Sequence, residues 1–139
     1  MELNLWRSRV NHALTPAEWR WFETVLQEYR FQLMREGKAS GSKAVDEALR
    51  QTIHGRPLAE VMREGLQLHL RRKTGERDEM KFAFGRNEQK RRLVRAGETD
   101  TLSALEHHQK TLAEKIARNE TEITAAQAAF TAFEAKAGR

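Results

Sequence analysis

The sequence predicts a mainly α-helical protein in which a small helical N-terminal domain is followed by a long C-terminal coiled-coil helix. Three observations lead to this prediction. Apolar residues recur at helical spacing along most of the chain, capping residues and glycines separate the helical stretches, and only two prolines interrupt them. The strongest pattern begins at Leu102, where apolar residues fall at alternating steps of three and four through the last third.

Length and composition narrow the class of protein. The 139 residues are enough for one modest core and an extension. Charged residues make up 32% of the chain, and no apolar run has the length of a membrane span or of a signal-peptide core. The absence of cysteine excludes disulfides and thiolate metal sites and fits a reducing compartment. We therefore expect a cytoplasmic protein that has no membrane partner.

The first helix has a clear start and stop. Residues 6–14 alternate weakly between apolar and polar, which indicates a short strand or an irregular arm. Thr15 can then cap a helix, Pro16 suits its first position, and Glu18 can close a capping box. The helix is expected to end before Gly37, where a polar linker begins.

Two further helices follow the linker. The second is expected from Ser42 to about His54, and Pro57 opens a third that ends before Gly75. Residues 76–97 are less regular, because MKFAF alternates like a strand and also fits an interrupted helix. We therefore divide the chain into a helical domain at residues 1–74, a basic connecting segment at residues 75–97 and a coiled-coil helix at residues 98–139.

The positive charge is concentrated in one short segment. Residues 71–95 contain ten basic and four acidic side chains, a net charge of +6, whereas the whole chain carries +5. A local excess of this kind indicates a polyanionic partner. The alternative is a solvated helix face whose acidic partners lie elsewhere in the fold. The basic residues that we expect to contact phosphates are Arg71, Arg72, Lys73, Arg77, Lys90, Arg91, Arg92 and Arg95.

The C-terminal seam predicts a helical partner. With Leu102 at an a position, isoleucines occupy a and leucines occupy d, the pattern of two parallel strands. Gln109 and Asn119 are polar seam positions that penalise wrong registers. We expect a homodimer through Leu102, Leu105, Leu112, Ile116, Asn119, Ile123, Phe130 and Phe133. The alternative is that the helix folds back, so that its terminal phenylalanines pack on the first helix.

The order of elements over residues 6–54 is a second informative feature. Arg7, Arg9 and Asn11 share one face of the alternating segment, a capped helix follows, and GSKAVDEALRQTI opens the next helix. This order resembles the ribbon-helix-helix class of DNA-binding proteins, in which paired strands read base edges and the second helix binds a phosphate. The resemblance implies that Arg7, Arg9 and Asn11 read bases and that Ser42 and Lys43 clamp a phosphate.

Two alternatives to this arrangement remain open. A second register of the same class takes YRFQLM as the strand and places the two helices at SKAVDEALRQTI and PLAEVMREGLQLHL. That register interrupts the helical stripe through Tyr29 and Leu33. The other alternative is an ordinary helical bundle that is preceded by an arm.

Motifs for catalysis are missing. No phosphate-binding loop, dinucleotide-binding glycine pattern or serine nucleophile elbow is present, and no two of the five histidines have the i, i+4 spacing of a zinc site. We therefore expect a non-enzymatic protein without cofactor or metal. The leading hypothesis is a dimeric nucleic-acid-binding accessory or regulatory protein, with DNA preferred to RNA. The alternative is a helical protein-interaction module, such as an adaptor, an assembly subunit or an inhibitor of a nucleic-acid enzyme.

Overall fold

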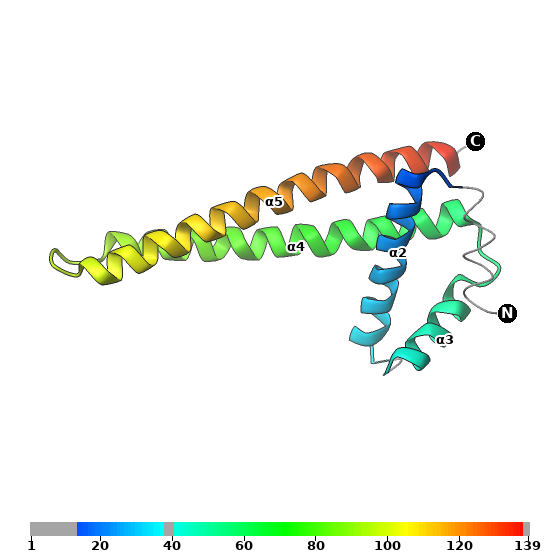
Figure 1. Ribbon diagram of the computed structural model, residues 1–139, viewed down its shortest axis with the longest axis horizontal. Coiled ribbons are helices and arrows are strands. Elements are labelled where there is room, and N and C mark those ends of the chain that lie inside the picture. Colours follow the sequence, from blue (N-terminus) through cyan, green and yellow to red (C-terminus); the bar gives the residue numbers. More distant parts are fainter. Residues whose placement is uncertain (1–13, 38–40, 138–139) are drawn as a thin grey trace. The chain divides into compact units, whose positions relative to one another are not determined.

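The computed structural model describes residues 14–37 and 41–137 and shows a mainly α-helical protein. In chain order the described helices are α2 (Pro16–Arg35), α3 (Ser42–Ile53), α4 (Leu58–Arg92) and α5 (Thr99–Ala137), as Figure 1 shows. The described residues contain no strand. The arm or strand expected at residues 6–14 lies, except for its last residue, outside the described part of the chain.

Helix α2 begins as its sequence predicts. The Thr15 hydroxyl accepts a hydrogen bond from the Glu18 backbone N–H at 3.2 Å, and the Thr15 backbone N–H donates to the Glu18 carboxylate at 3.1 Å. This reciprocal capping box and Pro16 in the first turn satisfy amides that would otherwise lack partners. The helix stops at Gly37, whose φ of 69° is accessible to glycine at little cost. The predicted start and stop of this helix are confirmed.

Helix α4 is longer than the sequence predicted. It continues without a break from Leu58 to Arg92, so the expected end at Gly75 is wrong, and so is the alternative of a strand at MKFAF. Gly75 and Gly85 both lie inside the helix, and a Cβ atom added at either would meet nothing within 4 Å. The predicted basic connecting segment is therefore mostly helix, followed by a short turn at residues 93–98 in which Gly97 has a φ of 97°.

The chain divides into two compact units. The first contains the described residues up to Leu70 together with those from Ala126 onward, and the second contains Arg71–Ala125. Helices α4 and α5 therefore each contribute one part to each unit. In this division the end of α5 belongs with α2 and α3.

The first unit has an apolar core. Aromatic and aliphatic side chains of α2 meet those of α3, the start of α4 and the end of α5; the buried members are Phe22, Val25, Leu26, Tyr29, Leu33, Leu49, Ile53, Val61, Met62, Leu66 and Phe133. Helices α2 and α4 approach closely at Gly65, where an added Cβ would lie 2.2 Å from Val25 Cγ1. Only a residue without a side chain permits this approach.

The second unit is an antiparallel pair formed by α4 and α5. Lys73 pairs with Glu122 near one end, and the Gln109 side-chain amide donates to Glu88 near the other. Among the described residues of this unit, Leu112 is the buried apolar side chain. The other buried side chains are the amides of Asn87, Gln109 and Asn119. Polar groups thus occupy most of the buried positions between these two helices.

Candidate nucleic-acid interface

The residues that were predicted to read bases and clamp a phosphate lie near the start of the chain. Arg7, Arg9 and Asn11 fall outside the described residues, and their role stays a prediction. Ser42 and Lys43 are exposed in the first turn of α3. Gly41 precedes them with a φ of 83°, and no side chain caps the helix there. The amides of this turn are therefore available to a ligand, although no other observation indicates an anion.

A hollow of about 390 Å³ lies beside this turn and bears on the phosphate prediction. It is lined by Gln27, Arg30, Met34, Gly41, Ser42, Val45 and Asp46. Arg30 already forms an ion pair with Asp46 at 2.9 Å. A phosphate here would compete with that carboxylate and be repelled by it. The hollow is consequently a weaker anion site than Ser42 and Lys43 alone suggest.

Half of the predicted phosphate-binding residues are engaged within the second unit. Arg72 pairs with Glu76 at 2.7 Å, and Lys73 pairs with Glu122 of α5 at 2.6 Å. Arg77 Nε lies 3.4 Å from Oδ1 of its neighbour Asp78. Arg91 is the fourth cation of this group and pairs with Glu88 at 3.3 Å. These four cations hold acidic side chains and are less available to a polyanion.

The remaining predicted cations are free within the described chain. Arg71, Lys90, Arg92 and Arg95 are exposed and form no ion pair with any described residue. Lys90, Arg92 and Arg95 lie together where α4 ends and the turn begins. Basic side chains at a helix C-terminus also stabilise the helix dipole, which is the structural explanation for their position. The helix dipole acts only on charges within about the last turn, and the charges of these three side chains still face solvent.

The outward face of α4 next to these cations carries residues that the sequence reading missed. Phe82, Arg86 and Lys90 follow one another at steps of four, so they share one side of α4, and Leu93 follows in the turn. Phe82 is 68% exposed and Leu93 is 80% exposed. The Arg86 guanidinium carbon lies 5.9 Å from the centre of the Phe82 ring. Reading MKFAF as helix would have revealed the Phe82–Arg86 spacing.

The seam that was expected to join two copies is buried within one chain. Leu112, Asn119 and Phe133 are between 4% and 8% exposed with no second chain present. Phe133 belongs to the apolar core of the first unit, and Phe130 packs against that core. Leu102, Leu105, Ile116 and Ile123 are half-buried. The fold-back alternative thus describes the packing of Phe130 and Phe133, and the expected homodimer stays a prediction.

The amides of the seam are only partly satisfied. The Gln109 amide donates to Glu88 at 2.9 Å, and the Asn119 amide donates to Glu76 at 3.4 Å. Gln109 Oε1, Asn119 Oδ1 and Asn87 Nδ2 are buried without a hydrogen-bond partner in the described chain. The hydrogen bond from Gln109, together with the charge of Arg91, holds the pKa of Glu88 below its usual range. Glu88 of α4 thus contacts both Gln109 in the seam and Arg91 on the basic surface.

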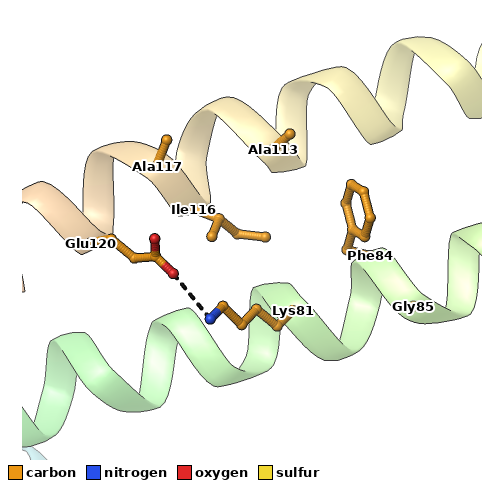
Figure 2. A pocket seen from close by; sticks show the side chains of 7 residues that line it. All are labelled: Lys81, Phe84, Gly85, Ala113, Ile116, Ala117 and Glu120. Atoms are coloured by element: carbon orange, nitrogen blue, oxygen red, sulfur yellow. Dashed lines mark ion pairs between the residues drawn. The ribbon is translucent and has the colours of Figure 1, made fainter.

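An apolar groove lies between α4 and α5 within the second unit, on another side of α4 from Phe82. Figure 2 shows Phe84, Ile116, Ala113 and Ala117 around it, and its volume is about 450 Å³. Lys81 and Glu120 form an ion pair of 3.0 Å at one end of the groove. Apolar lining with a polar end is the pattern of a site for a small apolar group or a partner side chain.

The first unit contains a buried polar pair that is separate from the basic surface. His69 Nδ1 lies 2.6 Å from Glu28 Oε1, and both side chains are at most 9% exposed. Trp21 contacts the imidazole edge-on, with ring centres 6.2 Å apart. Burial also raises the pKa of Tyr29, whose hydroxyl donates to the Val61 carbonyl at 3.3 Å. These contacts join α2 to α4 and have the character of core hydrogen bonds.

The described residues contain neither a cluster of metal-ligating side chains nor a helix suited to cross a membrane. No group of three or more histidine, aspartate or glutamate side chains is arranged to hold a metal ion there. None of the described helices combines the length and the apolar character needed to cross a membrane. In comparisons with protein-family models, curated proteins and solved structures, the chain has no match.

Proposed function

We propose that this protein is a non-catalytic nucleic-acid-binding accessory protein. It contacts its ligand through the outward face of α4 from Phe82 to Lys90 and through the adjoining turn. The observation that supports this proposal is the group of Lys90, Arg92 and Arg95, which are exposed and have no ion-pair partner in the described chain. Exposed cations that form no close ion pair gain most from displacing counterions on a phosphate backbone.

The charge distribution supports nucleic acid over an acidic protein surface in one respect. Arg72, Lys73, Arg77 and Arg91 are held by carboxylates of the same unit, which fixes their side chains along α4. Of the cations without an ion pair, Lys90, Arg92 and Arg95 lie at the end of α4 and in the turn, and Arg71 lies at the start of the segment. A partner therefore meets unpaired positive charges next to cations that carboxylates already hold. Phosphate contacts to these charges position the ligand without selecting a sequence. The proposal gives the seam residues no role in self-association.

A pair of double charge reversals tests this function. Lys90→Glu with Arg92→Glu changes the free group, and Lys110→Glu with Lys115→Glu makes the same change of charge on exposed positions of α5. We expect the first variant to bind a generic DNA at least about tenfold more weakly at moderate salt, and its salt dependence to lose about one unit of slope for each lost contact. The second variant is expected to bind nearly as wild type does.

The readout is fluorescence anisotropy of labelled DNA, titrated at several salt concentrations. If both double variants lose the same amount of DNA affinity, the effect is one of net charge, and the assignment of the binding surface to α4 is wrong. If the wild-type chain binds neither DNA nor RNA at low salt, the proposal fails altogether.

A second candidate function is a helical protein-interaction module. The apolar groove lined by Phe84, Ile116 and Ala117 favours it, because such a groove accepts an apolar side chain of a partner helix. Ala117→Arg would block the groove from an exposed position. If this function is correct, the variant loses binding to the isolated partner while its affinity for nucleic acid is unchanged.

A further inference from the structure

An exposed aromatic ring lies on the outward face of α4. Phe82 is 68% exposed; the other exposed large apolar side chains of the described chain are Met34 and, in the turn after α4, Leu93. Exposed apolar side chains are common singly, but Arg86 and Lys90 follow Phe82 on the same side of the helix. The same short stretch thus combines an exposed ring with basic side chains that form no ion pair with any described residue.

The spacing of these residues defines a narrow strip. Phe82 and Lys90 are eight residues apart, which corresponds to about 12 Å along a helix that rises 1.5 Å per residue. Arg86 lies between them and over the Phe82 ring, with 5.9 Å from guanidinium carbon to ring centre. Phe82 remains 68% exposed in spite of this contact. A planar group can therefore reach the ring while Arg86 and Lys90 remain close to its substituents.

We propose that this strip is a binding surface for single-stranded nucleic acid, in which Phe82 stacks on an unpaired base and Arg86 and Lys90 contact the adjoining phosphates. The inference rests on the proposed function and names the form of the ligand. In a duplex the faces of the bases are stacked on one another, so an exposed phenylalanine has no ring to cover. A single strand offers a π-face at every base, and basic side chains along the strip follow its backbone.

The chemistry of the strip fits a strand of either sugar type. Phe82 recognises a base by its flat face, and the cations recognise phosphate oxygens, so neither group reads a base edge or a 2′-hydroxyl. The acidic residues Asp78 and Glu79 end the strip on the N-terminal side, which keeps the strand near Phe82 rather than along the whole of α4. The expected binding is therefore tolerant of sequence and strongly dependent on salt.

The test compares Phe82→Ala and Phe82→Leu with the wild-type full chain. The probes are a labelled thymidine homopolymer and a labelled uridine homopolymer of about twenty nucleotides, and a duplex of the same length. We expect the wild type to bind the single strands more tightly than the duplex. Each variant should weaken single-strand binding by about 5- to 150-fold, the range of base–aromatic stacking, without changing the salt slope. Because Phe82 is exposed, both variants should fold, which circular dichroism checks.

The outcomes separate this inference from the function on which it rests. If no probe is bound, the proposed function fails. If the duplex is bound as tightly as the single strands, or if Phe82→Ala leaves single-strand affinity unchanged, the protein still binds nucleic acid but the stacking inference is overturned. Retention of full affinity by Phe82→Leu would also overturn it, because leucine keeps apolar bulk and lacks a π-face. Unequal affinity for the two homopolymers identifies DNA or RNA as the preferred strand.

Discussion

The two compact units bury side chains of different kinds. The eight largest fully buried side chains all lie in the first unit, where they belong to α2, α3 and the beginning of α4. In the second unit, the buried positions are Leu112 and the amides Asn87, Gln109 and Asn119. Burial of apolar surface is the main favourable term in folding, whereas a buried amide without a partner costs free energy. Stability is therefore concentrated in the first unit, and the candidate interface lies on the less stable one.

This difference suggests a division between folding and binding within one short chain. The first unit holds the start of α4 and the end of α5 through Met62, Leu66 and Phe133. The second unit needs only to keep α4 helical through this stretch, so that Phe82, Arg86 and Lys90 stay on one face. A polar seam is sufficient for that task.

The largest effect is expected from truncating the two kinds of core. Phe22→Ala removes a fully buried ring from the first unit and should reduce the free energy of unfolding by about 3–5 kcal/mol. Leu112→Ala removes the buried apolar side chain of the second unit and should cost about 2 kcal/mol, the low end of the range for leucine, because its surroundings are polar. Urea denaturation of both variants measures the difference. A larger loss for Leu112→Ala would reverse the comparison.

Two glycines of α4 provide a matched pair for the next effect. Gly65→Ala places a Cβ 2.2 Å from Val25 Cγ1 and should destabilise the first unit by about 1–3 kcal/mol through overpacking. Gly75→Ala meets nothing within 4 Å and should stabilise the helix by about 0.5–1 kcal/mol, because alanine loses less backbone entropy. Thermal unfolding reports both signs. Stabilisation by Gly65→Ala would show that α2 and α4 are packed less closely than the structure has them.

A substitution in the seam tests the cost of its polar side chains. Asn119 is buried, and its Oδ1 has no partner in the described chain. The hydrogen bond that its Nδ2 donates to Glu76 is long, at 3.4 Å. Asn119→Leu should therefore raise the free energy of unfolding by about 1 kcal/mol. Thr121→Leu places the same side chain at an exposed position and should change stability by less than about 0.5 kcal/mol. Destabilisation by Asn119→Leu would mean that the amide is better satisfied than the seam indicates.

The smallest effect is a pH dependence at Glu88. The Gln109 hydrogen bond lowers the pKa of this carboxyl in the folded chain relative to its value in the unfolded chain. Its contribution to stability is therefore fully present above the unfolded-state pKa and is lost as the pH falls through the folded-state value. Urea midpoints from about pH 6 to about pH 3 should fall more steeply for the wild type than for Glu88→Gln. Parallel curves for the two proteins would show that Glu88 does not contribute.

Local signals in the sequence were sufficient for the short helices. Thr15, Pro16 and Glu18 predict the start of α2 because capping depends on neighbours within one turn, and Gly37 predicts its end for the same reason. Gly75 and Gly85 gave the wrong prediction. A glycine inside a helix costs about 1 kcal/mol, which packing of α4 along α5 offsets, and this packing depends on residues far along the chain.

The partner of the seam and the state of the cations could not be predicted for the same reason. A heptad pattern shows that one face must be buried, but it does not identify the helix that buries it. The charge excess of residues 71–95 was visible in the sequence, whereas the pairing of Lys73 with Glu122 and of Lys81 with Glu120 depends on the fold-back of α5. Only after the ion pairs are known do Arg71, Lys90, Arg92 and Arg95 stand apart from the paired basic residues of this segment.

Hydrogen exchange of the full chain, followed by mass spectrometry, tests most directly whether the two units differ in stability. Amides of α2 between Phe22 and Leu33 should exchange only through the most costly opening of the protein. Amides between Phe82 and Arg92 of α4, and between Leu102 and Leu112 of α5, should exchange much faster through opening of the polar seam. Equal protection in all three segments would contradict the account, because it would show one cooperative core that includes the candidate interface.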